Sequence, residues 1–380
     1  MRGVVRFLIA LIVILAIAYL GGWWYVQSRM AVAFRHQEQT LRAAGWTISH
    51  GDTTRGSSPL AATYTIADLA ITPPAQTASP DLPRPTITLP YFSLEVDLAA
   101  PFTLDIGLPL TWRIAMSQGP AFALRFTTIH DDYQLDPNAL IHDAPDPLRT
   151  GNLSFTGMRL DSADTNFTLI SIGAYSATGT TDPTAGTGGT AFTLHQSLKD
   201  LALSPIFVTL GHLPFDGKLA ALRFDIDLSG PKFPTRAISP QPGAPLPKPG
   251  TPEQAWQRIG PLVHDWAKAG GHGSFAIALD LGPLKAHDHG RFSFDATPQP
   301  QGRMTLVGDG VGEILGDIAS AYPKTVGIIS LLTTQSAPYM SKTPNGHQRL
   351  TVDFGLANGI LTANGKKIAH VPPIVWPTAP

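Results

Sequence analysis

Residues 354–368 read FGLANGILTANGKKI, and they hold two Asn-Gly pairs six residues apart. Asn-Gly readily supplies the positive φ angles of a type I′ turn, which joins antiparallel strands through a two-residue loop. The segment therefore predicts two consecutive β-hairpins near the C-terminus. They lead into an apolar tail, HVPPIVW (370–376).

The alternation of apolar and polar residues continues upstream of these hairpins. ATYTIADLAI (61–70) alternates as a half-buried strand does, and so does TITLPYFSLEVDLA (86–99). The second run changes phase at Pro90-Tyr91, which predicts a bulge or an edge position because proline has no N–H to donate.

Further strand-like runs recur every ~10–15 residues with turn residues between them, which favours antiparallel meanders over βαβ units. They span 102–106, 110–115, 120–127, 152–160, 166–178, 217–229, 273–281, 290–297, 301–307, 349–356 and 359–363. We predict a mainly β fold with a few helices. Its antiparallel meanders form a twisted, half-open sheet, and a transmembrane helix precedes them.

The N-terminal helix is predicted from Phe7–Ser28, a stretch of 22 residues without a charged side chain. At ~1.5 Å per residue a helix of this length spans about 33 Å, enough for the ~30 Å hydrocarbon layer. The aromatic residues WWY (23–25) fit the interfacial belt of such a helix. We expect residues 1–29 to be an anchor that contacts the inner membrane through residues 7–28.

A cleaved secretory signal peptide is the alternative, because AIA (16–18) has the form of a cleavage site. The anchor is favoured because the apolar run continues past that site into the aromatic residues. Both interpretations export the rest of the chain. We expect a single-pass protein whose C-terminal region lies in the periplasm, since a long C-terminal domain translocates largely regardless of flanking charge.

The exported region divides at a segment rich in proline, residues 230–252. It predicts a semi-rigid linker between a first β-rich half, 46–229, and a second, 253–380. One continuous sheet with a proline-rich loop is the alternative. Residues 30–45 are expected to form an exit helix, and two more helices are expected at about 252–269 and 311–333.

Composition limits the classes of partner and chemistry. Lys and Arg number 27 and Asp and Glu 28, so the net charge of −1 argues against nucleic acid, which needs a concentrated positive field. Cysteine is absent, which excludes disulfides and a cysteine nucleophile. The motifs G-x-S-x-G, H-E-x-x-H and G-x-x-x-x-G-K-[ST] do not occur.

Two glycine-rich segments fit a dinucleotide loop only loosely. Gly308-Asp309-Gly310 follows a strand, but the third glycine of the motif is replaced by Glu313, whose charge would repel a pyrophosphate. Gly186, Gly188 and Ala191 lie in what we interpret as a long polar loop. We therefore predict no nucleotide site.

Histidines and aspartates are the remaining candidates for chemistry. The densest histidine group is His264, His272, His287 and His289. The triplet His287-Asp288-His289 offers two metal ligands, but we interpret it as a solvated turn because no third and fourth ligand is evident.

A cluster of aspartates is interpreted as solvated loop residues, since the spacing of a calcium loop is absent. Its members are Asp131, Asp132, Asp136, Asp143 and Asp146. Trp256 and Trp266, at helical spacing, are expected in the core. We predict no catalytic, cofactor-binding or metal-binding residue, and no cofactor.

Four segments carry a resemblance to a known family. They are QTLRAAGW (39–46), the apolar strands up to about 127, WAKAGGHGSF (266–275) with the following GRFSFD, and FGLANGILTANGKKIAHVPP (354–373). In these the chain resembles the bacterial domain of unknown function 2125, which supplies no activity and no functional residues. More loosely, an anchor followed by β-meanders is similar to AsmA-like envelope proteins, whose curved sheets form apolar grooves for lipid chains.

The leading functional hypothesis is a non-enzymatic envelope protein that binds a lipid or another apolar ligand. A curved sheet with an apolar concave side would shield acyl chains at ~0.8 kcal/mol per buried CH₂. One alternative is a scaffolding module that binds envelope proteins through its sheet edges. Another is a hydrolase whose Ser, His and Asp are dispersed along the sequence.

Overall fold

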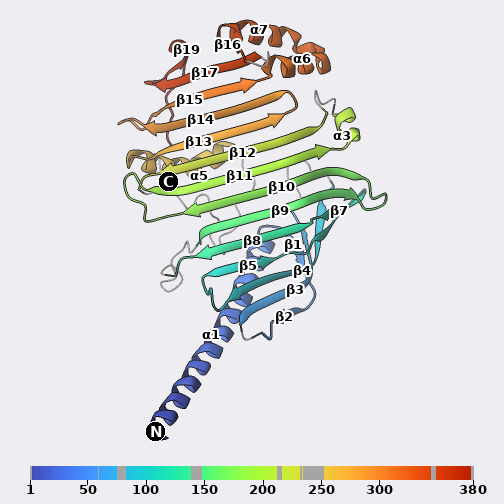
Figure 1. Ribbon diagram of the computed structural model, residues 1–380, viewed down its shortest axis with the longest axis vertical. Helices are drawn as coiled ribbons and strands as arrows, with labels where there is room; N and C mark the ends of the chain where they lie inside the picture. Colours follow the sequence, from blue (N-terminus) through green and yellow to red (C-terminus); the bar gives the residue numbers. More distant parts are fainter. Residues whose placement is uncertain are drawn as a thin grey trace. The chain divides into compact units, whose positions relative to one another are not determined.

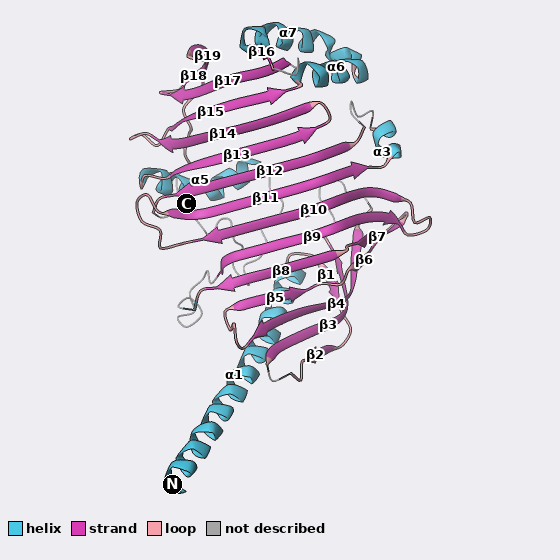
Figure 2. Cartoon of the chain, viewed as in Figure 1, coloured by secondary structure: helices cyan, strands magenta, loops and turns pink. Residues whose placement is uncertain are grey.

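The computed structural model describes residues 2–58, 60–74, 83–137, 148–211, 216–231, 233, 252–343 and 348–377, and the side chains of the N-terminal helix from Leu20 onward. The fold is mainly β, as predicted, with antiparallel strands and a few helices (Figure 2). The chain divides into two compact units, one made mainly of residues before Thr150 and one mainly of residues from Thr150 onward.

The first unit combines one long helix with a small sheet (Figure 1). Its strands are antiparallel, with β3 paired to β4 at its centre. β1 and β2 pair with the other side of β3, β5 and β6 both pair with β4, and β8 pairs with β5. The elements are α1 (Arg2–Ala43), β1 (Thr47–Ser49), β2 (Thr53–Arg55), β3 (Ala61–Thr72), β4 (Pro85–Asp97), β5 (Thr103–Gly107), β6 (Thr111–Met116), β7 (Ala121–Arg125) and β8 (Thr128–Leu135).

The phase change predicted at Pro90-Tyr91 occurs at an edge position and not at a bulge. Pro90 lies between the residues of β4 that pair with β6 and those that pair with β5, so on that side it has no strand partner among the described residues. Ala67 pairs with Tyr91 and Leu69 with Leu89, so no extra residue is inserted between them. Asp68, with φ of 49°, lies between the two paired residues of β3. Because Asp68 is left-handed, the side chains of β3 change to the other face of the sheet at the same point as those of β4. Pro90 of β4 has no N–H, so no ladder hydrogen bond from it is lost there.

The C-terminal part of α1 belongs to the core of this unit. Trp23 Nε1 donates a hydrogen bond to the carbonyl of Ala61 over 3.1 Å. Gln27, 1% exposed, donates through Nε2 to the carbonyls of Gly56 and Thr63, at 3.0 and 3.3 Å. These bonds fix α1 on β3 beside a buried cluster that includes Met30, Ala31, Ile48, Ala62, Tyr64, Ile66, Leu69, Leu89 and Val96.

The predicted membrane span, 7–28, includes residues 7–19, whose side chains are outside the described set. Among the residues that the structure describes, no helix combines the length and the apolar character needed to cross a membrane. The three aromatic residues 23–25 differ in their exposure. Trp23 is partly buried against the sheet, whereas Trp24 and Tyr25 are 60% and 59% exposed.

The second unit is a meander in which each strand from β9 to β15 pairs with the next, antiparallel throughout. β15 pairs with β17, which continues through β18 to β19. The strands are β9 (Leu148–Ser162), β10 (Thr168–Thr181), β11 (Thr190–Leu203), β12 (Lys218–Ser229), β13 (His272–Leu281), β14 (Leu284–Phe294), β15 (Pro300–Asp309), β16 (Met340–Lys342), β17 (Gln348–Ala357), β18 (Ile360–Ala363) and β19 (Lys366–His370).

Both Asn-Gly hairpins are confirmed. Asn358 and Gly359 have φ of 50° and 69°, and Asn364 and Gly365 have 47° and 78°. Each pair forms a two-residue loop, with Ala357 opposite Ile360 and Ala363 opposite Lys366. The positive φ at both loop positions is the requirement of a type I′ turn.

Helices lie at the ends of the strands or on one face of this sheet (Figure 1). They are α3 (Pro205–Leu210), α5 (Pro252–Lys268), α6 (Val311–Ala321) and α7 (Val326–Ser336). Residues 311–333, expected as a helical stretch broken at Pro323, contain α6 and most of α7, and the break is where it was expected. Pro323, with no N–H to continue α6, begins the short 3₁₀ turn Pro323–Thr325 between them.

The compact units do not divide at the proline-rich segment 230–252. The strands on either side of it, β12 and β13, are direct neighbours, with Asp227 opposite Ser274 and Ser229 opposite His272. Residues 230, 231, 233 and 252 are described and the rest of the segment is not. Pairing across it places β12 and β13 in one sheet.

Replacing Gln27 by alanine should weaken the first unit, because the carbonyl of Gly56 loses the amide donor and the carbonyl of Thr63 keeps only the backbone N–H of Gly56. We expect the free energy of unfolding to fall by about 2 kcal/mol. Gln37→Ala is the matched control, since Gln37 is exposed on the same helix. Denaturant unfolding of the full chain measures both variants, and an equal effect of the two would contradict this role for Gln27.

Candidate functional site

The two faces of the second sheet differ in chemistry because successive residues of a strand point to opposite sides. On β12, Arg223, Asp225 and Asp227 share one side, which we call the polar face. Its in-register neighbours are mostly polar as well: Thr193, His195, Ser274, His287, His289, Arg291, Arg303, Thr305 and Asp353. The other side, the apolar face, carries Leu194, Leu198, Leu222, Phe224, Ile226, Leu228, Phe275, Ile277, Leu279, Phe292, Met304, Leu306, Val352 and Phe354.

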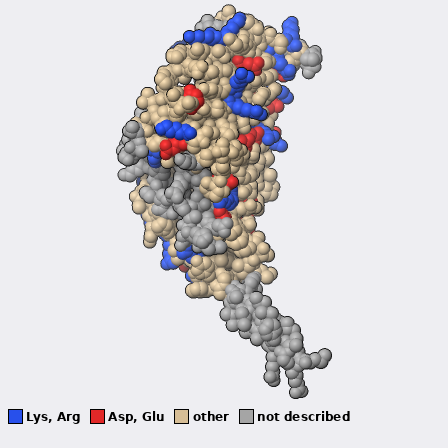
Figure 3. Space-filling view, turned by 90° about the vertical axis from the view of Figure 1, so that its left-hand side faces the viewer, with Lys and Arg blue, Asp and Glu red and all other residues tan. Residues whose placement is uncertain are grey.

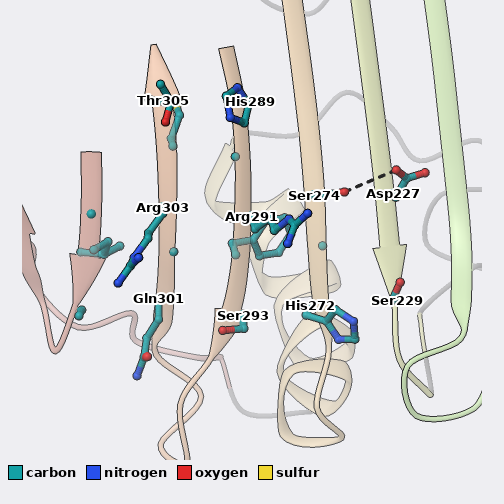
Figure 4. Close-up of a pocket in the computed structure, with 18 of the residues that line it drawn as sticks. Asp227, Ser229, His272, Ser274, His289, Arg291, Ser293, Gln301, Arg303 and Thr305 are labelled. Carbon is teal, nitrogen blue, oxygen red and sulfur yellow. Dashed lines mark hydrogen bonds between the residues drawn. The ribbon is translucent and has the colours of Figure 1, made fainter. Parts of the chain in front are cut away.

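A groove of about 1600 Å³ lies on this unit, and polar-face side chains form most of its lining. It crosses strands from β10 to β18, and Figure 4 labels lining side chains on β12, β13, β14 and β15. The polar-face lining includes hydroxyl or amide groups of Ser229, Ser274, Ser293, Gln301 and Thr305. The lining of the groove is thus mostly polar, whereas the lipid hypothesis anticipated an apolar trough. The alternation of side chains along each strand places most of the aliphatic residues on the opposite face.

Arg291 and Arg303 lie side by side in this groove. They are in direct register on β14 and β15, and both side chains are exposed. Figure 4 shows Arg291 turned toward Ser274 and Arg303 turned the other way. A guanidinium offers a planar fork of donors that matches the oxygens of a carboxylate or phosphate, so this part of the groove can bind oxyanions.

The carboxylates in and beside the groove bond to hydroxyl groups. Ser274 Oγ donates to Asp227 Oδ2 over 3.5 Å, drawn as the dashed line in Figure 4. Thr305 Oγ1 donates to Asp353 Oδ1 over 2.7 Å. These two acids are therefore held by neutral partners.

A histidine–carboxylate network lies on the same face, beside the groove. His195 Nδ1 is 2.8 Å from Asp225 Oδ1, and Arg223 Nε donates to Asp225 Oδ2 over 2.7 Å. Partial burial raises the pKa of Asp225, but the hydrogen bonds from Arg223 and His195 outweigh burial and lower it overall. In the described part of the chain, no serine hydroxyl is hydrogen-bonded to a histidine.

Helix α5 covers one end of the apolar face. Trp266, 4% exposed, packs edge-on against Phe292 and Phe294, and its Nε1 donates to the carbonyl of Ser229 over 3.0 Å. Gly271 makes room for it, because a Cβ there would lie 2.5 Å from the indole ring. Trp266 is a core residue as predicted, whereas Trp256 is 36% exposed and packs on Trp376, with ring centroids 5.4 Å apart.

Asp288 interrupts the apolar face. It is in register with Ile277 on β13 and Leu306 on β15, and its Oδ1 is buried without a hydrogen-bond partner. Burial raises the pKa of Asp288, and the neighbouring His287 and His289 oppose the shift only in part.

The histidine group is not gathered into one site. His272 and His289 line the groove, His287 lies on the same face, and His264 stacks on Trp376 with ring centroids 5.1 Å apart. The triplet 287–289 lies within strand β14 and not at a turn, so Asp288 points away from both histidines. No group of metal-binding residues occurs in the described ranges.

The aspartate cluster is also dispersed, and part of it is not loop. Asp131 and Asp132 lie on β8, whereas Asp136 follows it and pairs with Arg149. Asp131 Oδ1 is buried without a partner, and burial raises its pKa. Burial and the adjacent Asp131 together raise the pKa of Tyr133 to about 12. Asp143 and Asp146 lie outside the described residues.

The glycine-rich segments have structural roles. Gly310, with φ of 73°, precedes α6, and Asp309 binds Arg349 through two hydrogen bonds of 2.6 and 2.7 Å. Gly186 and Gly188 lie between β10 and β11, as the polar-loop interpretation predicted, whereas Ala191 is in β11.

The arginine pair was missed by the sequence analysis. Arg291 follows Gly290 and Arg303 follows Gly302, in strands that alternate ordinarily. Predicting that the two arginines are neighbours would require the register of β14 against β15, and sequence periodicity does not determine that register.

These features define a β protein whose second unit has one polar, grooved face and one apolar face. The family model described as "Uncharacterized protein conserved in bacteria (DUF2125)" matches residues 23–372. The chain belongs to this family, as the resemblance suggested. No curated protein and no solved structure matches it.

Replacing Asp288 by asparagine should stabilise the chain at neutral pH. Burial raises the pKa of Asp288 in the folded state, so the ionised carboxylate destabilises the fold. The destabilisation is absent below the unfolded pKa of 3.8 and develops as pH rises through the folded pKa. We expect a gain of about 1 kcal/mol near neutral pH that disappears below pH 3.8.

Urea unfolding of the full chain at neutral and acidic pH measures this effect. Asp280→Asn is the matched control, because Asp280 lies on the polar face 3.3 Å from Lys285 and gains nothing from losing its charge. A loss of stability in Asp288→Asn at neutral pH would contradict the unpaired state of this carboxylate.

Proposed function

We propose that the apolar face of β11–β15 binds the acyl chains of lipids. The observation that carries this proposal is the run of in-register aliphatic and aromatic side chains that remain half-exposed. Phe224, Ile226 and Ile277 are only half-buried, and Leu222 is 37% exposed.

The energetics favour a chain-like apolar occupant on this face. A buried CH₂ contributes about 0.8 kcal/mol, so an acyl chain laid across several strands would gain several kcal/mol. Among the described helices, α5 covers only the end near Trp266, and α6 contacts β14 and β17. The occupant would therefore lie along the open face, opposite the groove.

We further propose that residues 7–28 anchor the chain in the inner membrane and that both units face the periplasm. The uncharged N-terminal stretch supports this location. α1 is continuous from Arg2 to Ala43, and Trp23 and Gln27 are bonded to the first unit. An anchor formed by this helix would hold the first unit directly at the membrane surface.

Strand addition by a partner protein is less well supported. β19 is an edge strand exposed along its whole length, but it carries Lys366 and Lys367. Charged lysines on an edge strand oppose pairing with another chain.

Lipid binding is tested with a phospholipid that carries a photoreactive group in its acyl chain. After illumination of the full chain, we expect crosslinks to peptides of β11–β15. Leu222→Glu should reduce crosslinking several-fold, because it places a charge on the apolar face. Ala221→Glu, the adjacent residue on the polar face of the same strand, should leave it unchanged.

Equal crosslinking of Leu222→Glu and the unchanged chain would refute lipid binding on this face. Thermal unfolding of both variants shows whether they are folded. A defined protein partner, captured in place of lipid by crosslinking in cells, would favour the scaffolding function.

Localisation is tested separately by treating spheroplasts with protease. We expect the chain to remain in the membrane fraction after alkaline extraction and the two units to be digested from outside. Release by alkaline extraction, or full protection from protease, would each contradict the proposed anchor and orientation.

A further inference from the structure

The second sheet places two positive charges directly opposite each other. Arg291 on β14 and Arg303 on β15 are an in-register pair. Such pairs have Cβ atoms about 4.5–5.5 Å apart, and like charges in this position destabilise a sheet. Figure 4 shows the two side chains turned apart, as mutual repulsion favours.

Neither arginine is neutralised within the described part of the chain. No carboxylate lies within salt-bridge distance of either guanidinium there. Three other cations on the same face are paired: Arg223 with Asp225 at 2.7 Å, Lys285 with Asp280 at 3.3 Å and Arg349 with Asp309 at 2.6 Å. Lys199 on β11, farther along this face, has no acid within salt-bridge distance among the described residues. The arginine pair is distinct because two cations without an acid lie directly opposite each other.

The groove around the pair is rich in donors and poor in acids. Its lining includes His272 and His289 beside the two arginines, but among the described lining residues the one carboxylate is Asp227, which already accepts a hydrogen bond from Ser274. Ser274 is also in register with Arg291, on the far side from Arg303. Hydroxyl and guanidinium donors thus adjoin each other on the polar face.

The space beside Arg303 holds only a small side chain, the hydroxyl of Thr362 over Gly355. The neighbour of Arg303 on β17 is Gly355, which has no side chain to fill the groove or to pair with the guanidinium. Once the two side chains turn toward each other, a tetrahedral oxyanion between the two strands would accept hydrogen bonds from both guanidiniums and remove their repulsion.

We propose that Arg291 and Arg303 form a binding site for a phosphate group, on the face opposite the proposed lipid surface. The group is carried either by a small soluble ligand or by an anionic lipid headgroup. Both sources offer the same charge and the same oxygen acceptors. The site does not depend on lipid binding by the apolar face.

The experiment measures two probes on the purified full chain at low salt. One is inorganic phosphate, titrated by calorimetry. The other is binding to vesicles of phosphatidylglycerol, compared with vesicles of phosphatidylcholine. The variants are Arg291→Gln, Arg303→Gln and the double variant.

Lys366→Gln combined with Lys367→Gln is the matched control. It removes two positive charges from exposed positions on β19, in the same sheet but outside the groove. Thermal unfolding is recorded for every variant. The arginine variants should unfold at the same temperature as the unchanged chain or higher, because they relieve like-charge repulsion.

Phosphate affinity that falls at least tenfold in the double arginine variant and less than twofold in the control supports a soluble phosphate ligand. Absence of phosphate binding, with a preference for phosphatidylglycerol that is lost in the double arginine variant alone, supports a headgroup. Binding of neither probe, or an equal loss in the lysine control, overturns the site.

Discussion

Register is the constraint on which the second unit depends. Side chains alternate between faces with a period of two, so a slip of one residue would move every aliphatic side chain to the polar face. Two-residue turns at Asn358-Gly359 and Asn364-Gly365 set the register where each hairpin begins, although the pairing of β18 with β19 shifts by one residue between Leu361 and Thr362. The separation of the polar face from the apolar face therefore rests on backbone geometry at the turns as well as on the hydrophobic effect.

Packing of the apolar face relies on glycines where aromatic rings cross the sheet. A Cβ at Gly290 would lie 2.5 Å from the ring of Phe275, and one at Gly271 would collide with Trp266. The rings fill space that glycine leaves open and so bring α5 close to β12–β14. The middle of the face has no comparable cover among the described residues, and this difference is the basis for proposing an acyl-chain ligand there.

The first unit solves a different problem, which is how to hold a long helix on a small sheet. Gln27 is a polar residue in an otherwise apolar helix face, and its amide satisfies two carbonyls of the sheet segment. A buried amide with its donors used fixes orientation more sharply than aliphatic packing alone, because a rotated helix would leave carbonyls unpaired. α1 and the first unit are thus one structural body.

The sequence by itself determined the mainly β class, the antiparallel meander, the two terminal hairpins and the helix beginning at Pro252, because each follows from local periodicity or turn chemistry. It also pointed to the family through short segments that the family model then matched. It did not determine that 287–289 is part of a strand, because the polar Asp288 breaks the apolar alternation of β14.

Only the tertiary structure decided which residues meet. Arg291 and Arg303 are 12 positions apart and are brought side by side by one strand pairing, and the division into units is set by which strands pair across long sequence distances. The groove lies on the polar face for the same reason. Periodicity fixes which residues share a face of one strand, but only pairing between strands decides which faces join into a surface.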